Sequence, residues 1–548
     1  MIVLMCSAAF AQSTVTLGPY LQKVTQTGIV IKWWTDDTTT TAKVMYGTDP
    51  NNLTLTATDA TLSSRHSVSI SGLSPYTRYY YALYDGNTRL EGSADHTWRT
   101  FPAEGNDVPV RAWVIGDFGK GNEKQRRVHE AYTAYDTVGT DLWLWLGDNV
   151  YDDGLEQEYV NKVFTGANGY QQIMKGLPFQ PTPGNHDYNV ISPVVSTKSP
   201  PTHTGPYYDF VDVYDSAQAG GQPSGYQLYY SFDYSNAHFI SLNSELGSPL
   251  NTAHDWTGAR FGGGFTTSPM LEWLKADLDS NKKDWVIIYL HQPPYTDGSH
   301  ESTAWYEVYM KAIRENFAPV WEAYGVDLVI CGHTHVYERS YLVKGAYGDP
   351  DEITPFNFVQ TTSGKESLGE AYLKYTTGQT PNQGTVYVNN GNSGSSEGSA
   401  NFNHPYMYSE YGCDTCCGSL VLDIVGKKLV GKHLTMDGNI YDEFTIYKDY
   451  VASVNDVTEN ESVGNFKVMP NPFSNATSMS FDLKKDANVS IRLNDMVGKT
   501  YDVFKGDLKA GSHTYQVDAA KLQLAKGTYI LSINTGSSNA AKTVIKID

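Results

Sequence analysis

The chain has 548 residues, a formal net charge of -20 at pH 7 and an apolar fraction of 40%, which is enough for several globular domains, each with its own core. The acidic balance excludes nucleic acid and anionic membrane as main partners, because both require a basic surface that displaces counterions. An anionic substrate would need local positive charge, which bound metal ions could supply. The 40 tyrosines and the abundant small polar residues are typical of exported β-rich proteins.

The first residues have the character of an export signal. Residues 1–11 form a short apolar run that ends in Ala-Phe-Ala, the small-residue pattern of a cleavage site, although the usual basic start is missing. This run is too short to span a membrane, and no other apolar stretch has the length of a transmembrane helix. We therefore expect a signal peptide over residues 1–11 and no transmembrane segment. A lipoprotein anchored through Cys6 is the alternative, but Met5 is larger than the residue that usually precedes a lipidated cysteine.

Residues 14–102 have the pattern of an all-β domain. Short alternating segments such as Gly28 to Trp33 are separated by turn clusters such as Asp49 to Asn52, which predicts a β-sandwich. The segment Leu73 to Tyr81 has the order Leu-x-Pro-x-Thr-x-Tyr and resembles the tyrosine corner of fibronectin type III domains, where a Tyr hydroxyl ties a strand to the preceding turn. An ordinary aromatic strand is the alternative interpretation.

The pattern changes over residues 108–447 to longer apolar runs that alternate with helical stretches. Helices are expected over residues 122–135 and 270–281. This alternation predicts a central α/β sandwich of mixed sheets flanked by helices. Residues 448–465 are mostly polar and acidic without apolar periodicity, so we expect a linker there.

Residues 466–548 return to alternating strands and predict a second β-sandwich. The alternating apolar residues are Met479, Phe481 and Leu483, then Val489, Ile491 and Leu493, then Tyr529, Leu531 and Ile533. The opening Met-Pro-Asn-Pro-Phe, the strand Gly527 to Leu531 and the ending Lys542 to Lys546 resemble the C-terminal sorting domains of type IX secretion cargo. That resemblance implies export through the periplasm to the cell surface or medium, with the type IX secretion machinery as a partner. A carbohydrate-binding or adhesive sandwich is the alternative.

Five places in the central region share one arrangement, in which an apolar run is followed by a Gly or a tight turn and then by Asp, Asn or His. They are Gly116-Asp117, Gly147-Asp148, Gly184-Asn185-His186-Asp187, Leu290-His291 and Gly332-His333-Thr334-His335. Because the carboxyl ends of strands in an α/β sheet face a common crevice, these side chains can converge although they are far apart in the sequence. Glycine allows the backbone to turn sharply and pass close to such a site.

The donor atoms at these positions predict a site for two metal ions. Carboxylate, amide oxygen and imidazole form a mixed N/O set that suits iron, zinc or manganese, and no thiolate is involved. One ion would not use so many ligands. Two ions about 3.5 to 4 Å apart, bridged by a carboxylate, would use them and would form the clamp that favours phosphoester hydrolysis.

The order Gly-Asp-x-Gly, Gly-Asp-x-x-Tyr, Gly-Asn-His-Asp, a strand-end His and Gly-His-x-His resembles the motif series of the purple acid phosphatases. The resemblance covers the central domain, and the N-terminal sandwich is similar to that of the larger family members. The family usually has Glu in the third motif where this chain has Asp187, beside the ligands.

The resemblance implies a role for each motif residue. Asp117, Tyr151 and His335 are expected to hold a ferric ion, Asn185, His291 and His333 a divalent ion (zinc, manganese or iron), and Asp148 to bridge the two. Tyr151 is the residue that indicates Fe(III), because other calcineurin-like phosphoesterases lack a phenolate at that place.

Two histidines are expected to face the substrate. By the resemblance, His186 contacts the phosphate from just outside the ligand set, and His300 is similar to the second substrate-facing His of the family. A surface histidine is the alternative for His300. Of the remaining histidines, His238 is expected in the core with hydrogen bonds, whereas solvated positions are expected for His203, His254 and His404, although His404 could border the pocket. Trp143 and Trp145 are interpreted as packing residues.

The cysteines add little to the functional assignment. Cys331 ends an apolar run, where a buried thiol is expected. The cluster Cys413, Cys416 and Cys417 indicates a local disulfide or half of a metal site, and the absence of a second Cys pair favours the disulfide.

These features predict a secreted phosphatase that hydrolyses small phosphate monoesters with an acidic optimum. Metal-activated hydroxide would attack phosphorus, and His186 or His300 would protonate the leaving group. A phosphodiesterase or nucleotidase on the same scaffold is the nearest alternative, because the ligands fix the reaction class but the surrounding loops fix the leaving group. A non-catalytic surface adhesin is a remote alternative.

Overall fold

The structure is a computed structural model that describes residues 13–188, 205–245, 268–377, 381–398, 400–408, 410, 412–449, 463–495, 499–535 and 539–547. It divides into two units, Met1–Asp449 and Tyr450–Asp548. The predicted signal peptide lies outside the described residues, as do His203, His254 and most of the predicted linker. Within the described part, no helix is long and apolar enough to cross a membrane.

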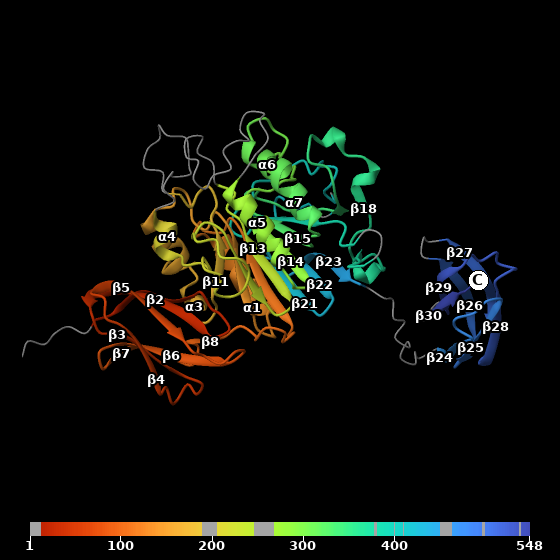
Figure 1. Cartoon of the computed structure of the whole chain (residues 1–548), viewed down its shortest axis with the longest axis horizontal. Coiled ribbons are helices and arrows are strands. Elements are labelled where there is room, and N and C mark those ends of the chain that lie inside the picture. The colour runs from red at the N-terminus through yellow and green to blue at the C-terminus, as the bar shows by residue number, and fades with distance from the viewer. Residues whose placement is uncertain are drawn as a thin grey trace, which may run out of the picture. The chain divides into compact units, whose positions relative to one another are not determined.

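The N-terminal region is a sandwich of two β-sheets (Figure 1). One sheet has the order β1-β2-β5 and the other the order β4-β3-β6-β7, with β8 paired to β6. Tyr79 lies on β6, and its hydroxyl accepts a hydrogen bond from the Ser74 N–H at 2.9 Å. This bond confirms the predicted tyrosine corner. The strands are β1 (Val15–Gln22), β2 (Gly28–Thr39), β3 (Ala42–Gly47), β4 (Leu55–Asp59), β5 (Ser63–Ser71), β6 (Arg78–Asp85), β7 (Thr88–Glu91) and β8 (Thr97–Arg99).

This sandwich is packed against the central region of the same unit. The ring of Trp34 stacks on Phe210 with centroids 5.2 Å apart, and Tyr20 meets Phe164 edge-on at 5.0 Å. The hydroxyl of Tyr214 donates to the Val24 carbonyl at 2.7 Å. Both regions contribute to one continuous hydrophobic core.

The central region contains two mixed sheets, which confirms the predicted α/β sandwich. The first has the order β11-β10-β9-β21-β22-β23-β19, and β9, β10 and β11 run parallel. The second has the order β12-β13-β14-β15-β20-β16, with β13, β14, β15 and β20 parallel. The first-sheet strands are β9 (Val110–Ile115), β10 (Leu142–Leu146), β11 (Phe179–Thr182), β19 (Tyr372–Lys374), β21 (Gly418–Val425), β22 (Lys428–Thr435) and β23 (Ile440–Lys448). Those of the second are β12 (Tyr230–Tyr234), β13 (Ala237–Ser241), β14 (Trp285–Leu290), β15 (Leu328–Cys331), β16 (Tyr337–Arg339) and β20 (Val386–Asn390), and β17 (Leu342–Val343) pairs with β18 (Phe358–Gln360) outside it.

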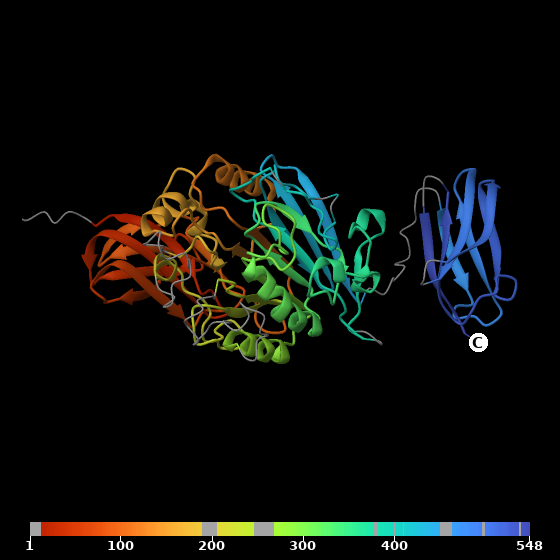
Figure 2. The same ribbon diagram turned by 90° about the horizontal axis from the view of Figure 1, so that it is seen from above.

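The two sheets lie between two groups of helices (Figure 2). Helix α1 (Glu123–Tyr135) contacts β21 and β22 of the first sheet. Helix α5 (Pro269–Ser280) and the segment of α6 (Val308–Ala312), a π-helical turn (Ile313–Phe317) and α7 (Ala318–Ala323) lie on the other side. The region also contains the short helices α2 (Glu156–Glu158), α3 (Gln171–Met174) and α4 (Pro206–Phe210), a second π-helical turn (Tyr159–Phe164) and several 3-10 turns.

The two predicted helices begin and end within one residue of their expected positions. Asn122 is the N-cap of α1, and its side chain accepts from the Gln125 N–H, while Ser268 caps α5 by accepting from the Leu271 N–H. Such caps satisfy backbone donors that have no partner within the helix. The buried strands carry Trp143 and Trp145 into the core as packing residues, as predicted.

The C-terminal unit is a β-sandwich with its own core. Its sheets have the orders β24-β25-β28 and β27-β26-β29-β30. The nine alternating apolar residues expected to face inward, Met479 to Leu483, Val489 to Leu493 and Tyr529 to Ile533, are all buried. The strands are β24 (Val463–Met469), β25 (Ala476–Leu483), β26 (Ala487–Asp495), β27 (Thr500–Leu508), β28 (Gly511–Asp518), β29 (Gly527–Asn534) and β30 (Asn539–Lys546).

Predictions for two histidines had opposite outcomes. His238 is buried and hydrogen-bonded to Asp233 and Asp277, as expected. The solvated position expected for His404 is wrong. His404 is buried beside the rings of Tyr295 and Tyr406, and burial lowers its pKa to about 3.

The cysteine predictions are confirmed. Cys413 and Cys416 form a local disulfide, and Cys331 is a buried free thiol. Cys417 is also free and buried.

Candidate metal centre

The candidate ligands lie where the strands of two different sheets end. Asp117, Asp148 and Asn185 follow β9, β10 and β11 of the first sheet. His291 follows β14, and His333 and His335 follow β15 of the second sheet. The side chains therefore converge at the junction of the two sheets, whereas the sequence argument placed them at the edge of one.

Asp117, Tyr151 and His335 form one group of side chains. The Tyr151 hydroxyl lies 3.0 Å from Asp117 Oδ1 and 3.1 Å from His335 Nε2. His335 Nε2 lies 3.5 Å from Asp117 Oδ1. Phenol, carboxylate and imidazole thus face one another, in the combination predicted for the ferric ion.

Asn185, His291 and His333 form the second group. Asn185 Oδ1 lies 3.0 Å from His291 Nε2 and 3.0 Å from His333 Nδ1, and these two nitrogens are 3.2 Å apart. His291 Nδ1 is 3.0 Å from the Leu146 carbonyl, to which it can only donate. This bond occupies Nδ1, so Nε2, directed toward the other members of the group, is the nitrogen that a metal ion would take in exchange for a proton.

Asp148 is positioned beside both groups. Its Oδ1 lies 3.4 Å from His291 Nε2, and ligand atoms of Asp117, Asp148 and His291 all lie within 4.8 Å of one another. Burial raises the pKa of Asp148, but His291 and His186 more than offset this effect and hold the pKa below its usual range. Its carboxylate is therefore ionised in the position expected of a bridging ligand.

The electrostatics of the cluster fit a cation. Carboxylate oxygens, an amide oxygen and imidazole nitrogens are all electron-pair donors, and crowding them in a buried space is costly unless positive charge lies between them. The pKa of His333 lies well below its usual range because of burial and the neighbouring histidines, so its ring is neutral and able to coordinate. The donor set thus matches iron, zinc or manganese by chemistry.

Two glycines of the motifs allow the backbone to approach the cluster closely. A Cβ atom at Gly184 would lie 2.2 Å from the Asp148 nitrogen, and one at Gly332 would lie 2.5 Å from Asp117 Oδ2. Both distances are far below contact. The glycines of these motifs are thus required by space, as the sequence argument expected.

Asp187, where the chain departs from the usual family motif, supports the ligand loops. Its carboxylate accepts from the Gly184 N–H at 2.6 Å, from the Asn149 side chain at 3.0 Å and from the Tyr159 hydroxyl at 2.5 Å. Burial and the nearby Asp148 raise the pKa of Asp187 to about 7. It holds the segments that carry Asp148 and Asn185 in contact.

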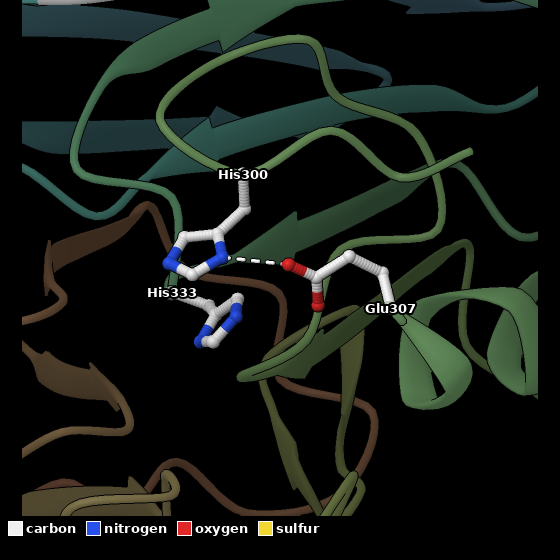
Figure 3. Close-up of side chains that lie close together, drawn as sticks. All are labelled: His300, Glu307 and His333. Carbon is white, nitrogen blue, oxygen red and sulfur yellow. Dashed lines mark hydrogen bonds and ion pairs between the residues drawn. The ribbon is translucent and has the colours of Figure 1, made fainter. Parts of the chain in front are cut away.

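The two histidines expected to face the substrate lie beside the ligands. The His186 ring lies tilted against the Tyr151 ring with centroids 4.5 Å apart, and its Nδ1 lies 2.6 Å from the Asp152 carbonyl. His300 lies with its ring centroid 4.2 Å from that of His333 (Figure 3). Its side chain is 36% exposed and is held by Glu307, so it is not a free surface histidine.

Sequence reasoning missed two carboxylates that hold histidines of the site. Glu307 Oε1 lies 2.7 Å from His300 Nδ1 (Figure 3), and Glu397 Oε1 lies 2.5 Å from His335 Nδ1. Glu307 precedes α6, and Glu397 lies in the loop that follows β20. No local pattern marks either residue, because each meets its partner only through the tertiary fold.

The strand ends of two mixed sheets thus bring one mixed N/O donor set together, as the resemblance to calcineurin-like phosphoesterases led us to expect. Residues 110–337 match the model of the calcineurin-like phosphoesterase family, and residues 17–107 match that of the purple acid phosphatase N-terminal domain. The chain therefore belongs to the purple acid phosphatase type of calcineurin-like phosphoesterases. Residues 467–547 match the secretion system C-terminal sorting domain, which confirms that resemblance as well.

Over the aligned regions, the curated relatives are identical to this chain at about a quarter of the residues. An uncharacterized protein of Mycobacterium tuberculosis is 26% identical over 359 residues, covering 60% of this chain and 62% of the relative. Purple acid phosphatase 1 of Ipomoea batatas is 26% identical over 333 residues, covering 58% of this chain and 62% of the relative. The chain thus spans about three fifths of the length of these relatives.

The fold is also similar to that of a solved purple acid phosphatase. The structure of purple acid phosphatase PPD1 from yellow lupin (Lupinus luteus) seeds superposes with a TM-score of 0.58 at 18% identity, covering 79% of this chain and 74% of that chain. At this identity the similarity concerns the fold alone.

Proposed function

We propose that the protein is an exported acid phosphatase that hydrolyses phosphate monoesters at a dinuclear Fe(III)–M(II) centre. The observation that carries the proposal is the convergence of Asp117, Asp148, Tyr151, Asn185, His291, His333 and His335 from five strand ends of two sheets. The sorting domain at residues 467–547 supports export to the cell surface or medium.

In this proposal the metal ligands form two halves that share one carboxylate. Asp117, Tyr151 and His335 would hold the ferric ion, Asn185, His291 and His333 the divalent ion, and Asp148 both. When bound, such a pair of ions activates water as the nucleophile and neutralises charge on the phosphoryl oxygens.

Two histidines beside the ligands, His186 and His300, would bind the phosphoryl group and protonate the leaving group. His186 lies next to Tyr151 and Asp148, where its Nε2 can donate to a phosphoryl oxygen. His300 lies over His333, with Nδ1 bonded to Glu307, so in its imidazolium form the proton on Nε2 can pass to the leaving oxygen and leave a neutral imidazole. Protonation of the leaving oxygen increases the rate most when the departing alkoxide is strongly basic.

The first experiment tests metal content and substrate class together. Freshly purified protein should contain two metal ions per chain by elemental analysis, one of them iron. It should hydrolyse a chromogenic phosphomonoester faster than the corresponding diester, with an optimum below neutral pH. One ion or none per chain would contradict the site, and a preference for the diester would favour a phosphodiesterase on the same scaffold.

The second experiment tests the ferric assignment through Tyr151. A phenolate bound to Fe(III) gives a charge-transfer band in the visible, so the oxidised protein should be purple or pink. Replacing Tyr151 with Phe removes the phenolate oxygen but keeps the buried ring, so absorbance should fall far more than hydrolysis. A colourless wild type that binds two zinc or manganese ions would refute iron while leaving the phosphoesterase assignment intact.

A further inference from the structure

The loop that follows β20 lies between the candidate metal ligands and the disulfide turn. This loop comprises residues 391–398, and the disulfide turn comprises residues 413–418. The loop has hydrogen bonds to the ligand segments on one side and to the disulfide turn on the other.

On the ligand side the loop contacts two residues expected to hold the ferric ion. Ser393 Oγ accepts from the Gly116 N–H at 3.2 Å, and Ser395 Oγ donates to the Asp117 carbonyl at 3.3 Å. Glu397 Oε1 lies 2.5 Å from His335 Nδ1. Because a carboxylate oxygen accepts the hydrogen bond, the shared proton lies on His335 Nδ1, and Nε2 is the ring nitrogen that faces Tyr151 and Asp117.

On the other side the loop is fastened to the disulfide turn. The Asn392 side chain donates to the Cys416 carbonyl at 3.0 Å, and the Gly398 N–H donates to the Asp414 carbonyl at 3.1 Å. The turn itself is closed by the Cys413–Cys416 disulfide and anchored to β16 by paired backbone bonds between Cys413 and Tyr337.

These contacts matter because Glu397 is otherwise a surface side chain. Its side chain is 44% exposed, so without a fixed backbone it would sample several rotamers and lose the hydrogen bond to His335. Lys124 adds a further tie by donating from Nζ to Ser396 Oγ at 2.7 Å. The carboxylate therefore reaches His335 from a loop whose two ends are held.

We propose that Glu397 is a positioning residue for the ferric half of the metal centre, and that the Cys413–Cys416 disulfide turn holds it in place. The inference rests on the proposed function, because it requires His335 to be a ligand. Glu397 fixes the tautomer and the orientation of the His335 ring, and the disulfide turn fixes the loop that carries Glu397. Partners of this kind change metal affinity by about 10- to 100-fold when they are removed.

The test measures iron retention directly. Wild type and Glu397→Ala are dialysed against increasing concentrations of a chelator, and the visible band and the total metal per chain are followed. Glu397→Ala should lose the visible band at a chelator concentration about 10- to 100-fold lower than wild type. The second ion should be retained as in wild type, because the hydrogen bond described for Glu397 goes to His335 and not to Asn185, His291 or His333.

Two further variants separate positioning from general damage. Glu397→Gln keeps an oxygen that can accept from His335 Nδ1, so its retention of iron should lie between wild type and Glu397→Ala. Glu410→Ala is the matched control, since Glu410 is an exposed glutamate in the same part of the chain whose carboxylate accepts from the Tyr408 hydroxyl. It should bind both ions as wild type does.

The disulfide is tested by the double change Cys413→Ser with Cys416→Ser. Iron retention should weaken in the wild-type background and should weaken less in the Glu397→Ala background, because both changes act on His335. Equal iron retention in wild type and Glu397→Ala would overturn the inference and leave the proposed function standing. A wild type that binds no metal would overturn both, and parallel loss of both ions in Glu397→Ala would show a structural role instead.

Discussion

Three of the candidate ligands have backbone conformations that side chains rarely adopt. The φ angles of Asp117, Asp148 and His333 are 56°, 48° and 68°, in the left-handed region. Each such residue costs on the order of 1–3 kcal/mol and persists only where the surroundings hold it. Here the His333 N–H donates to Asp117 Oδ2 at 2.8 Å, so one strained turn supports the next. The strain turns the side chains at the strand ends toward a common point.

At the same scale, the acid role proposed for His300 predicts that a change at Glu307 affects phosphate esters differently according to their leaving group. Its carboxylate is 12% exposed and accepts from His300 Nδ1, which directs His300 Nε2 away from Glu307. Glu307→Ala should lower kcat for an alkyl phosphate by about 100-fold, the lower end of the range for a lost general acid. For an aryl phosphate with a weakly basic leaving group, kcat should change little, because that oxygen leaves without a proton. Steady-state kinetics on both esters provide the measurement.

The controls for Glu307 come from the same loop. Glu301→Ala changes an exposed glutamate next to His300 and should leave both rates near wild type. In a His300→Ala background, Glu307→Ala should have no further effect, because it acts through that ring. Equal loss on both esters would indicate a structural role for Glu307. The side chain of Glu307 makes no cap hydrogen bond to α6, so the fold should tolerate the change.

The residue scale also shows which parts of the site the sequence could predict. Asp117, Asn185 and His335 were identifiable because each follows a buried strand within a compact motif. The histidine partners Glu307 and Glu397 were not, since their contacts join segments that are distant or irregular in the sequence. His404 was predicted to be solvated because its segment is irregular, but an irregular segment can still be buried under aromatic side chains.

At the scale of elements, α5 is tied to the second sheet by a buried ionic cluster. Asp277 on α5 lies 2.8 Å from His238 Nε2, and Asp233 on β12 lies 2.7 Å from His238 Nδ1. Lys283 lies 3.7 Å from Asp233 and is the remaining charged neighbour among the described contacts. Burial lowers the pKa of His238, but the hydrogen bonds to the two carboxylates outweigh it and raise the pKa to about 9.

This cluster predicts a pH-dependent contribution to stability. Because the folded pKa of His238 exceeds the unfolded value, its stabilising effect is fully present below about pH 6.5 and is lost as pH rises through about 9. The difference in unfolding free energy between wild type and His238→Gln should therefore be larger at pH 6 than at pH 10 by roughly 3 kcal/mol. A difference that is equal at both pH values would contradict the charged state of His238.

The measurement is denaturant unfolding followed by tryptophan fluorescence. All 11 tryptophans lie at or before Trp321, so the signal reports on the first unit without a contribution from the C-terminal sandwich. Lys275→Gln is a suitable control, because Lys275 pairs with Glu272 on the exposed face of the same helix. That pair should contribute less than about 1 kcal/mol at either pH.

The elements show why boundaries were predictable but sheet membership was not. Alternating or continuous apolar runs identify strands, and Asn122 and Ser268 mark helix starts by their capping chemistry. The pairing of β9 with β21, which joins residues more than 300 positions apart, has no local signature. The division of the five ligand-bearing strands between two sheets therefore required the structure.

At the scale of the whole molecule, the first unit is a single packed body made of two domains. The aromatic contacts of Trp34 with Phe210 and of Tyr20 with Phe164 bury side chains from both the N-terminal sandwich and the central region. Lys32 also pairs with Asp212 at 3.1 Å across this contact. Removing the N-terminal sandwich would expose the apolar side chains of the central region, so that part of the chain should not be separable from the enzyme.

The C-terminal unit should be separable from the first unit, because the described residues of its sandwich form their own core. A sorting domain has also completed its role once the protein is exported. A chain that ends near Asn465 keeps Asp449 and its bonds to Thr376 and Lys427. Expressed in a heterologous host, it should retain two metal ions, full phosphatase activity and the unfolding midpoint of the full chain by tryptophan fluorescence. A chain that starts at Val108 is the contrasting truncation, and it should aggregate or lose activity because it exposes Phe164 and Phe210. If the C-terminal truncation instead loses activity or metal, the last sandwich belongs to the enzyme and its role is not limited to export.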